Sequence, residues 1–440
     1  MGLLTFKGGV HPYDGKDISM DKEIQDFFSK SEMVYPLSQH IGAPAKPLVK
    51  KGDRVLRGQK IAEAGGFISA NIHASASGTV KIIEPRRTSG GNMVMSIVVD
   101  NDGLYESIDF SENVKPLEEL SPQDIRDIVK EAGIVGMGGA GFPTNVKLSP
   151  KNDDAIEYVL VNGAECEPYL TSDYRRMVEE SENLVAGLKI VVSMFPNAKG
   201  IIAIEDNKPA AIQKLREVVE KEDNISVNVM KTKYPQGGER SLIYANTGRK
   251  LNSKMLPADV GCIVSNVDTI IAIYHAVMEG KPLIDRIVTV TGDAIKEPVN
   301  FRVPVGTNCQ ELVDAAGGFV DGEPGKVIAG GPMMGKDMIS LDVPSVKGLS
   351  AILCLADNAV AEIPESNCIR CGKCASVCPS QLMPFNLANI GARGDLEAFQ
   401  ACDGMECVEC GCCSYICPAK RHLAQTIGAA RKQVLASRKK

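Results

Sequence analysis

One cysteine pattern occurs twice in this chain, first as Cys368-Ile-Arg-Cys-Gly-Lys-Cys-Ala-Ser-Val-Cys-Pro379 and again as Cys407-Val-Glu-Cys-Gly-Cys-Cys-Ser-Tyr-Ile-Cys-Pro418. Both copies read C-x2-C-x2-C-x3-C-P, so three thiols lie within seven residues and a fourth precedes a proline. Eight cysteines with this spacing match neither a zinc ribbon nor a small secreted disulfide scaffold. The pattern therefore predicts thiolate-bound metal centres near the end of the chain.

The spacing is typical of bacterial-type ferredoxins, which bind two [4Fe–4S] clusters. The first three cysteines of a copy bind one cluster, and the fourth crosses over to the other cluster. The predicted ligand sets are Cys368, Cys371, Cys374 and Cys417 for one cluster, and Cys407, Cys410, Cys413 and Cys378 for the other. Cys412 lies between two predicted ligands, but the spacing favours Cys413. We expect this part of the chain to transfer single electrons.

The composition is that of an ordinary soluble protein. The 440 residues predict about three domains, and the apolar and charged fractions are 44% and 24%. A net charge of −6 gives no support for nucleic-acid binding. No apolar run approaches the roughly 18 residues of a membrane span, and the first residues do not resemble a signal peptide. Because reduced thiolates and oxygen-sensitive clusters suit a reducing compartment, we expect a cytoplasmic location.

A β-rich module is predicted near the start of the chain. Between Tyr35 and Ile83, glycines recur every few residues between β-branched pairs, which favours short strands and turns. This run resembles the hammerhead domains of biotinyl and lipoyl carriers. A carrier needs a lysine at the hairpin tip, and none lies between Ala62 and Val80. We therefore interpret the module as structural.

An α/β region is predicted next. Ser121 as N-cap, Pro122 in the first turn and Gly133 as the stop signal predict a helix. Strand and helix patterns then alternate, with strands at Ile156–Val161, Gly200–Ile204 and Ile225–Met230 and helices at Ser181–Phe195 and Lys208–Glu222. This alternation predicts an α/β sheet that binds ligands at its open strand ends.

The remaining segments are shorter. Short β runs from Arg286 to about Leu349 predict a small mixed β domain. Gln381–Gln400 is predicted to be helical, and a last helix from about Arg421 ends in the basic tail Arg438-Lys439-Lys440. Such a tail is usually solvated, and docking to an acidic partner or an anionic lipid is the alternative.

A glycine loop, Gly136-Met-Gly-Gly-Ala-Gly-Phe-Pro-Thr144, lies between the first helix and the next strand. Its glycines let backbone amides approach an anion closely, as in phosphate-binding loops. The loop matches neither G-x-G-x-x-G after a strand nor G-x4-G-K-[ST]. On spacing alone, phosphate binding and a tight structural turn both stay open.

Together with Lys147, this loop resembles the flavin loop of the NADH-binding flavoprotein subunit of respiratory complex I. Val161–Pro168 and Val264–Thr269 resemble two further motifs of that family. The order of parts is more similar still to RnfC, the NADH-binding subunit of the Rnf complex, an ion-translocating ferredoxin:NAD oxidoreductase. Three other stretches match the RnfC family: Gly8–Pro12, Pro235–Glu239 and Gly330–Gly335. The resemblance covers nearly the whole chain.

The resemblance implies a multidomain fold that combines α/β, β and all-α parts. It implies a hammerhead-like barrel-sandwich domain at residues 1–100 and a Rossmann-like FMN/NADH-binding domain at 115–285. A β-grasp domain of the soluble-ligand-binding type at 286–350 and a helical two-[4Fe–4S] ferredoxin domain at 355–440 would follow.

The resemblance also implies roles for individual residues. The FMN phosphate and ring edge would be held by Gly136, Gly138, Gly139, Ala140, Gly141 and Lys147. Hydrogen bonds to the ring or ribityl chain would come from Asn162, Ser265, Asn266 and Thr269. Near the nucleotide and its nicotinamide would lie Phe142 and the catalytic pair Glu165 and Glu167. The NADH pocket would be bordered by Gly237, Gly238 and Glu239. Three departures, Met137, Ala164 and Ser265, each remove a polar contact that the complex I family has.

A flavin converts a hydride into single electrons, and this chain has a flavin-type loop and two predicted clusters. The resemblance therefore implies electron transfer between NAD(H), FMN and two [4Fe–4S] clusters. It implies a peripheral subunit at the cytoplasmic face of the membrane, with membrane subunits and a ferredoxin-accepting iron–sulfur subunit as partners. Electron flow would be coupled to Na+ or H+ translocation. Two alternatives stay open: a soluble cobalamin reductase of the same architecture, and a non-catalytic cluster scaffold.

Overall fold

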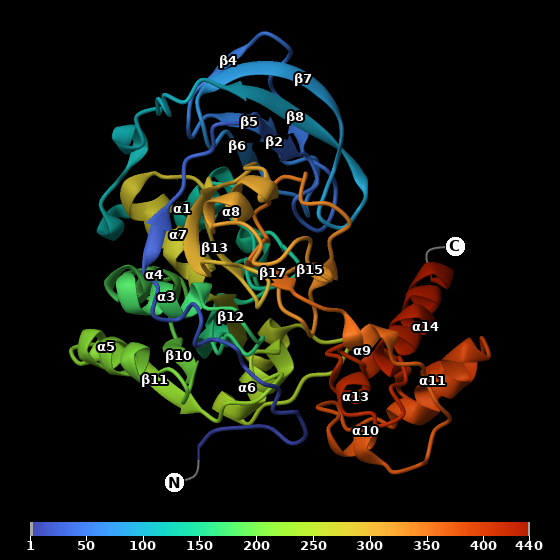
Figure 1. Ribbon diagram of the computed structural model, residues 1–440. Coiled ribbons are helices and arrows are strands. Elements are labelled where there is room, and N and C mark those ends of the chain that lie inside the picture. The colour runs from blue at the N-terminus through green and yellow to red at the C-terminus, as the bar shows by residue number, and fades with distance from the viewer. Residues whose placement is uncertain (1–2, 439–440) are drawn as a thin grey trace.

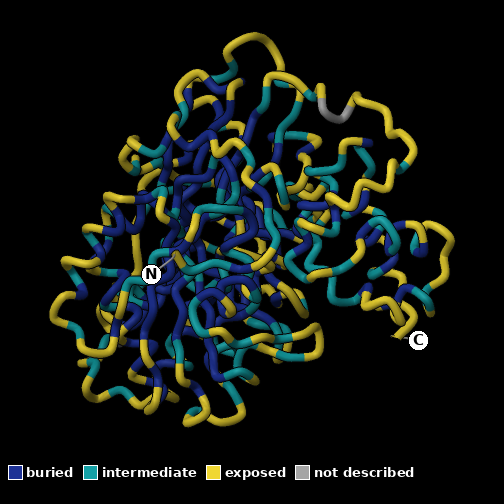
Figure 2. Tube along the Cα trace, turned by 90° about the horizontal axis from the view of Figure 1, so that it is seen from below, coloured by how far each residue is buried: buried dark blue, intermediate teal, exposed yellow. Residues whose placement is uncertain are grey.

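The computed structural model describes residues 3–438, apart from the side chains of residues 113, 360 and 361. The chain forms four packed parts, namely a pair of small β-sheets, an α/β layer, a mixed sheet and a helical C-terminal part (Figure 1). Buried segments concentrate in the central layers (Figure 2). Within residues 3–438, no helix is both long and apolar enough to cross a membrane. Lys439 and Lys440 of the predicted basic tail lie outside the described residues.

Two small antiparallel sheets form the N-terminal part, at the top of Figure 1. Their strands are β2 (Met33–Pro36), β3 (Lys46–Pro47), β4 (Arg54–Val55), β5 (Lys60–Glu63), β6 (Ile72–His73), β7 (Gly78–Arg87) and β8 (Met93–Asn101). One sheet has the order β2-β8-β7-β4 and the other β3-β5-β6. Tyr35, Ile61 and Val99 share one core between them. The strands continue past Ile83 because β7 and β8 pair as a long hairpin.

Helix α1 (Pro122–Glu131) begins at the predicted cap. The Asp124 amide donates to Ser121 Oγ at 3.2 Å, and the Ser121 amide donates to the Asp124 carboxylate at 2.9 Å. This capping box satisfies amides that the first turn leaves free. Gly133 follows the helix with a φ of +65°, which glycine adopts without strain.

Four parallel strands form the central sheet, β9 (Tyr158–Gly163), β10 (Lys199–Glu205), β11 (Ile225–Met230) and β12 (Cys262–Asn266). The first three confirm the predicted strands. The strand order is β11-β10-β9-β12. Strands β10 and β11 are therefore added on one side of β9, and β12 is added on its other side. In sheets of this kind, ligands bind beyond the carboxyl ends of the strands where the order reverses. That position lies here between β9 and β12.

Helices cover both faces of the central sheet. They are α2 (Thr144–Lys147), α3 (Ser172–Glu179), α4 (Ser181–Ser193), α5 (Pro209–Val219), α6 (Glu239–Thr247) and α7 (Val267–Glu279). Val159 and Ile202 share a core with α4, α5 and α7, whereas Leu160 and Ile201 pack with α6. Helices α4 and α5 confirm the predicted helices. Helix α7 was not predicted, because it is buried on several sides and shows no clear polar face.

A six-stranded mixed sheet follows, with strands β1 (Ile24–Asp26), β13 (Asp285–Thr291), β14 (Val299–Pro304), β15 (Lys326–Ala329), β16 (Lys336–Asp337) and β17 (Ala351–Leu355). Its order is β1-β14-β13-β17-β15-β16, and helix α8 (Cys309–Ala315) shares its core. Strand β1 precedes the N-terminal sheets in the sequence but pairs in parallel with β14. Leu4 and Val10 also form bridges to Met230 and Tyr234, so residues 4–26 contact both the central α/β part and the mixed sheet.

The C-terminal part is helical, with α9 (Ala359–Glu362), α10 (Lys373–Ser376), α11 (Pro384–Ala392), α12 (Leu396–Ala401), α13 (Cys412–Tyr415) and α14 (Leu423–Ser437). The segment Gln381–Gln400, predicted to be helical, contains two helices instead of one. Gly394 has a φ of +72° and breaks the run, and the Asp395 side chain caps α12. Short 3-10 turns occur at Ser111–Asn113, Leu117–Glu119, Asp153–Ala155, Pro257–Val260 and Gly404–Glu406.

Candidate redox site

Two hollows in the C-terminal part are each lined by cysteines from both copies of the pattern. The first hollow is lined by Cys368, Cys371, Cys374 and Cys417. The second hollow is lined by Cys378, Cys407, Cys410, Cys412 and Cys413. The structure thus brings the fourth cysteine of each copy to the first three cysteines of the other copy.

The two copies fold alike because their backbones turn at equivalent positions. Arg370 and Glu409 have φ values of +56° and +55°, and Gly372 and Gly411 have values of +74° and +80°. Short helices, α10 and α13, follow these turns and contact each other. Left-handed residues at these positions turn the chain tightly, so that successive thiols face one space.

The surroundings of the sulfurs fit iron–sulfur clusters. Over residues 3–438, no three His, Cys, Asp or Glu side chains are close enough to hold a single metal ion. The sulfurs stand instead around the two hollows, with Phe385 and Leu423 beside the first and Leu387 and Ile427 beside the second. Thiolates around a space in an apolar shell suit a cubic cluster.

The second hollow faces the rest of the molecule. Cys410 and Cys412 pack in one apolar cluster with Val10 and Tyr234, and Met333 packs against it. Nearby, the Arg240 guanidinium and the Glu406 carboxylate form an ion pair at 2.8 Å. In the first hollow, by contrast, Cys371 is exposed.

The glycine loop leaves several backbone amides free. The Gly136 amide donates to the Phe142 carbonyl at 2.8 Å and closes the base of the loop. At its tip, Gly138, Gly139 and Ala140 are exposed, and their amides donate no hydrogen bond within the described chain. Gly141, the next residue, has a φ of +69°. Free amides on an exposed glycine loop suit a phosphate group.

Three predicted site residues lie where β12 passes into α7. Asn266 Oδ1 caps α7 by accepting a hydrogen bond from the Asp268 amide at 2.9 Å. Thr269 Oγ1 accepts from the Met137 amide at 3.1 Å and so fixes the glycine loop to the helix. Ser265 is only 3% exposed, and its hydroxyl has no partner in the described part of the chain.

Thr144 presents a second buried hydroxyl without a partner among the residues described. Buried polar groups are nearly always hydrogen-bonded, so two unpaired hydroxyls next to the glycine loop are free to bind a polar ligand. The two hydroxyls, of Thr144 and Ser265, lie at the end of the glycine loop and at the end of β12. The chain therefore fits a polar ligand here. Thr144 is the last residue of the glycine loop, and its sequence position alone predicted no role for it.

Asn162 lies beside Asn266 because β9 and β12 pair in register at these residues. Asn162 Nδ2 donates to the Gly237 carbonyl at 2.8 Å, and the Gly237 amide contacts Cys166 Sγ at 3.3 Å. Gly238 and Glu239 follow as the N-cap and first residue of α6. The predicted flavin and NADH stretches thus meet at the carboxyl ends of β9 and β12.

Lys147 ends helix α2 and reaches the same edge of the sheet. Its Nζ donates to the Val264 carbonyl at 2.8 Å. Burial lowers the pKa of the Lys147 amine, and the Glu239 carboxylate opposes this shift. A cation at this edge stabilises a bound anion.

Glu165 and Glu167 are both engaged with backbone amides. The Glu165 carboxylate accepts from the amides of Asp173 and Tyr174, at 2.7 and 3.3 Å, at the start of α3. The Glu167 carboxylate accepts from the amides of Met333 and Met334, at 3.0 and 2.9 Å. Burial raises the pKa of both glutamates. Their role near a nicotinamide stays a prediction.

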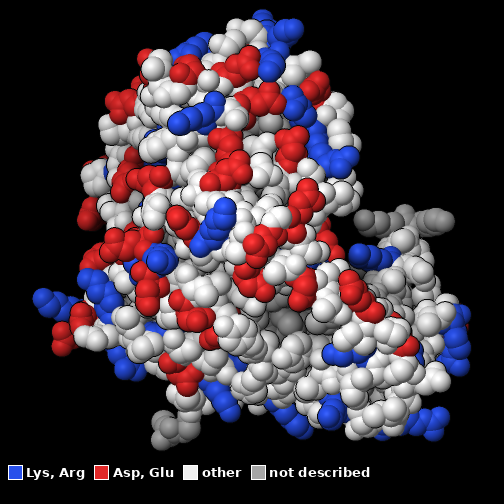
Figure 3. All heavy atoms as spheres, viewed as in Figure 1, with Lys and Arg blue, Asp and Glu red and all other residues white. Residues whose placement is uncertain are grey.

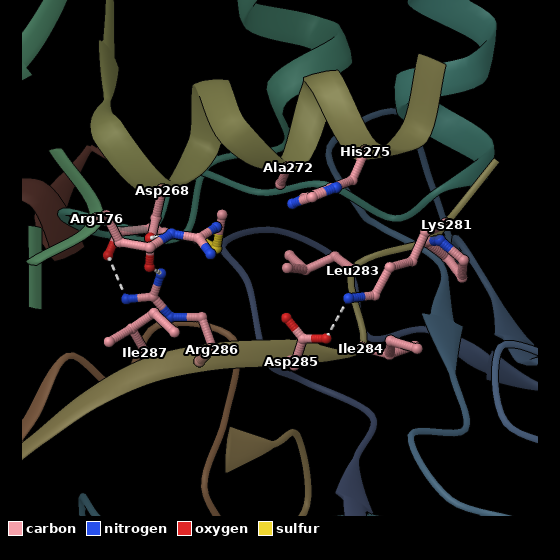
Figure 4. A pocket seen from close by; sticks show the side chains of 12 residues that line it. Arg176, Asp268, Ala272, His275, Lys281, Leu283, Ile284, Asp285, Arg286 and Ile287 are labelled. Carbon is pink, nitrogen blue, oxygen red and sulfur yellow. Dashed lines mark hydrogen bonds and ion pairs between the residues drawn. The ribbon is translucent and has the colours of Figure 1, made fainter. Parts of the chain in front are cut away.

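A small cavity behind the glycine loop holds a buried group of charges (Figure 4). Arg286 on β13 pairs with Asp268 and donates to the Met137 carbonyl at 3.4 Å. Arg176 on α3 pairs with the other Asp268 oxygen at 2.9 Å. The mixed sheet therefore supports the glycine loop directly.

Several residues of the site have no signal in the sequence. Lys16 Nζ donates to the Glu167 carbonyl at 2.9 Å and lies 3.9 Å from Glu165. Asp173 accepts from Asn266 Nδ2 at 2.6 Å, and burial, with Glu165 and Asp268 nearby, raises its pKa to about 8. Neither residue stands in a recognisable motif, and tertiary packing alone brings them here.

Comparisons with known proteins agree with this arrangement. Residues 4–104 match the RnfC barrel sandwich hybrid domain, and residues 129–275 match the Nuo51 FMN-binding domain. Residues 287–337 match the SLBB domain, and residues 367–420 match the 4Fe-4S dicluster domain. The chain therefore contains a barrel-sandwich domain, an FMN-binding domain, an SLBB domain and a dicluster domain, in this order.

Several relatives match most of the chain. The C subunit of the Na(+)-translocating ferredoxin:NAD(+) oxidoreductase complex of Acetobacterium woodii is 46% identical, over 99% of this chain and 98% of that protein. The proton-translocating counterpart of Clostridium ljungdahlii is 46% identical, over 89% of this chain and 85% of that protein. The C subunit of the ion-translocating oxidoreductase complex of Rhodobacter capsulatus is 41% identical, over 90% of this chain and 76% of that protein.

Solved structures share the fold at lower identity. Air-oxidised NAD+-reducing [NiFe]-hydrogenase matches with a TM-score of 0.52 and 19% identity, over 72% of this chain and 66% of that chain. The H2-reduced state of the same hydrogenase matches with a TM-score of 0.51 and 18% identity, over 73% of this chain and 62% of that chain. These matches show a common fold.

Proposed function

The chain belongs to the RnfC family, the C subunits of ion-translocating ferredoxin:NAD(+) oxidoreductase complexes, and on that basis we propose that it passes electrons between NAD(H), FMN and two [4Fe–4S] clusters. One observation carries this function more than any other. A single chain combines a ligand site at the ends of β9 and β12 with two four-cysteine hollows, and one apolar cluster joins the second hollow to the central sheet.

A bound flavin would supply the conversion between a two-electron hydride and single electrons. The protein holds and orients it. The free amides of Gly138, Gly139 and Ala140 would bind the phosphate, Gly136 and Gly141 would shape the loop, and Lys147 would add positive charge. Asn162, Ser265, Asn266 and Thr269 would hydrogen-bond the ring and ribityl chain, and Thr144 would join them, because its hydroxyl and that of Ser265 are unpaired among the described residues.

The nicotinamide nucleotide would enter beside the same edge of the sheet. Gly237, Gly238 and Glu239 border this space at the start of α6, and Phe142 closes the glycine loop. Glu165 and Glu167 hold the segments around this space in position. Glu165 accepts a hydrogen bond from a backbone amide of α3, and Glu167 accepts one from a backbone amide of the Gly330–Gly335 loop. In this proposal they position the site, and hydride transfer itself needs no acid or base.

The two cysteine sets would hold the clusters in the crossed pairing, since each hollow is lined by three cysteines of one copy and the fourth cysteine of the other copy. The set of the second hollow lies toward the flavin domain, and the set of the first hollow lies toward solvent. This order supports a path in which the second hollow exchanges electrons with the flavin domain and the first hollow exchanges them with a partner.

The finer assignments follow from the family. We assign the FMN domain to the Rossmann-like class, since its strand order β11-β10-β9-β12 matches the first four strands of that fold. The SLBB domain is assigned as a β-grasp and the barrel-sandwich domain as hammerhead-like. As a subunit of a membrane complex, the protein would sit peripherally at the cytoplasmic face, with membrane subunits and a ferredoxin-accepting iron–sulfur subunit as partners.

The test is anaerobic purification, followed by iron and flavin assays and a titration with NADH. We expect about eight irons per chain, one flavin, and the bleaching of both the flavin and the cluster absorption by NADH. Eight irons without flavin and without a response to NADH would refute the dehydrogenase function and favour an electron-carrying scaffold.

A further inference from the structure

Residues 4–10, here called the N-terminal strap, run from the central sheet to the C-terminal part. Figure 1 shows this segment in dark blue, passing below the central sheet and turning back beside the C-terminal part. At its start, the Lys231 amide donates to the Leu4 carbonyl at 2.9 Å. At its end, Val10 and Tyr234 exchange two hydrogen bonds, at 2.8 and 2.9 Å. Both ends of the strap are therefore bonded to the segment that follows β11.

The strap also contacts the second cysteine set. The Gly9 amide donates to the Val377 carbonyl at 2.8 Å. Val377 directly precedes Cys378, the predicted ligand that the first copy contributes to the second hollow. Val10 is 4% exposed and packs in one apolar cluster with Cys410. The strap thus reaches both copies of the cysteine pattern at the hollow that faces the flavin domain.

Two glycines make this close approach possible. Gly8 and Gly9 have φ values of +91° and +86°, which glycine adopts without strain. A Cβ on Gly8 would lie 2.8 Å from the Cys378 carbonyl oxygen. A Cβ on Gly9 would lie 2.7 Å from the Tyr234 carbonyl oxygen. Any side chain at these positions therefore pushes the strap away from the second cysteine set or from the central part.

Lys233 holds the strap from the side of the central sheet. Its Nζ donates to the carbonyls of Phe6 and Gly8, both at 2.7 Å. The same ammonium lies 4.1 Å from the centre of the Phe6 ring, within the range of a cation–π contact. Phe6 is only 6% exposed. One side chain thus fixes the backbone of the strap just before its contact with Val377.

The two copies of the cysteine pattern are held by different joints. Beside the second copy, Glu406 pairs with Arg240 of the central part at 2.8 Å. The first copy comprises residues 368–379. Among the described residues, its one hydrogen bond to the chain before residue 360 is the bond that Gly9 donates. The strap therefore sets the position of the first copy, and with it the fourth cysteine, relative to the flavin domain.

We propose that the N-terminal strap positions the second cysteine set for electron transfer with the flavin domain, and that Gly8, Gly9 and Lys233 are its positioning residues. This inference rests on the proposed function and adds the element that sets the distance between the two redox sites. The rate of electron transfer falls steeply as the distance between donor and acceptor grows. A misplacement of about 1 Å costs up to roughly 100-fold where geometry limits a step. A strap that holds the second hollow in place therefore keeps the transfer fast.

The electrons balance along this route. NADH gives up two electrons and one proton as a hydride, the electrons reach the second hollow one at a time, and the proton passes to water. In the reverse direction, NAD+ takes up two electrons and one proton. The strap itself forms no covalent bond and carries no electron in either direction.

The test uses the full, cluster- and flavin-loaded protein in two variants. Gly8→Ala places a Cβ against the Cys378 carbonyl. Lys233→Met removes two hydrogen bonds to the strap and keeps an apolar side chain of similar length. Gly52→Ala is the matched control for the first variant. Gly52 has the same φ of +91°, but no atom lies within 4 Å of its added Cβ.

Lys231→Met is the matched control for the second variant. Lys231 is exposed in the same segment, and its side chain has no hydrogen bond or ion pair within the described part of the chain. Figure 3 shows Lys and Arg side chains along the lower edge of the molecule, where the strap runs in the same view. Removing a charge there changes the local field, and Lys231→Met has this effect without loosening the strap.

Hydrogen exchange, followed by mass spectrometry, measures the strap directly. The amides of Gly9 and Val10 are hydrogen-bonded in the structure. We expect peptides that cover residues 4–10 to exchange faster in Gly8→Ala and Lys233→Met than in the unaltered protein. The two controls should match the unaltered protein.

Stopped-flow absorption after mixing with NADH then separates the two redox sites. Flavin bleaching should keep its rate in all variants, whereas cluster bleaching should slow by about tenfold in Gly8→Ala and Lys233→Met. Reduction of the clusters by dithionite should not change, because this small reductant reaches the exposed first hollow without the strap. A purely structural role would slow neither step selectively.

Two results would overturn the proposal. One is a variant whose strap exchanges faster but whose clusters are reduced at the rate of its control, and the other is unchanged exchange in both variants. If Gly8→Ala loses iron, Lys233→Met decides alone, since Lys233 contacts no cysteine of the hollow. An unaltered protein with full iron and flavin content that NADH cannot reduce would instead contradict the proposed function.

Discussion

Replacing Arg286 by Met removes a buried charge while keeping a side chain of similar length. Arg286 and Asp268 are only 3% and 2% exposed, and the pair joins the mixed sheet to the first turn of α7 (Figure 4). Arg286 also donates to the Met137 carbonyl of the glycine loop at 3.4 Å. The substitution therefore weakens the packing between two domains at the point where the flavin loop is supported.

The structure sets the expected magnitude. Removing one partner of a buried ion pair costs about 3–5 kcal/mol. Arg176 remains paired with Asp268 at 2.9 Å, so we expect a cost near the lower end, about 3 kcal/mol. Each kcal/mol lowers the unfolding midpoint by about 2–4 °C in a domain of this size, which predicts a fall of roughly 6–12 °C.

The assay is thermal unfolding of the loaded protein, with Lys281→Met as the control. Lys281 pairs with Asp285 at 2.6 Å near the surface of the same cavity, with side chains 19% and 15% exposed. In the Lys281→Met variant, Asp285 still has the Arg302 guanidinium as an ion-pair partner, at 4.0 Å. Because Asp285 also has Arg57 at 3.8 Å, we expect the control to lose less stability than Arg286→Met does and to show a smaller fall of the unfolding midpoint.

Flavin affinity provides a second readout. Arg286→Met should raise the dissociation constant of FMN, because the Met137 loop loses a donor, whereas Lys281→Met should not. If Arg286→Met lowers the unfolding midpoint no more than Lys281→Met does, the reasoning about the buried pair is refuted.

Three further predictions follow from the same contacts. Gly138→Ala should weaken FMN binding by about tenfold, since its Cβ would lie 2.9 Å from the side-chain Nδ2 of Asn266, the N-cap residue of α7. Gly139→Ala should not weaken FMN binding, because no atom lies within 4 Å of the added Cβ. Fluorescence titration measures the FMN affinity of both variants. Cys413→Ala should lose iron and Cys412→Ala should keep about eight irons per chain, by iron assay; equal losses would contradict the ligand assignment. Burial raises the pKa of Asp173 to about 8, so the folded state binds the extra proton between about pH 4 and 8, and stability should fall as pH rises through this window, by at most about 1.4 kcal/mol per unit. Asp173→Asn should flatten this slope in unfolding midpoints measured from pH 5 to 8, and an unchanged slope would contradict the assignment.

Much of the fold could be predicted from local patterns. The cap at Ser121, the strand at Ile225–Met230 and the helices that became α4 and α5 each carry their signal within a few residues. Two of the differences from the prediction have a clear physical reason. Helix α7 is buried on several sides, so its sequence shows no polar face, and the segment after Gln381 is split because Gly394 turns the chain.

The site was predictable only in part. The glycine loop and the ends of β9 and β12 carry recognisable residues, but their partners come from distant segments. Lys16 reaches Glu167 from the N-terminal end, and Arg286 reaches the loop from the mixed sheet. Long-range contacts of this kind leave no periodicity in the sequence.

The sequence by itself determined the two cysteine sets, because the spacing of ligands along a short loop is local chemistry. Only the tertiary structure decided which hollow faces the flavin domain and which faces solvent. That choice depends on Val10, Tyr234 and Met333 packing against the second copy, and such contacts between distant segments exist only once the chain has folded.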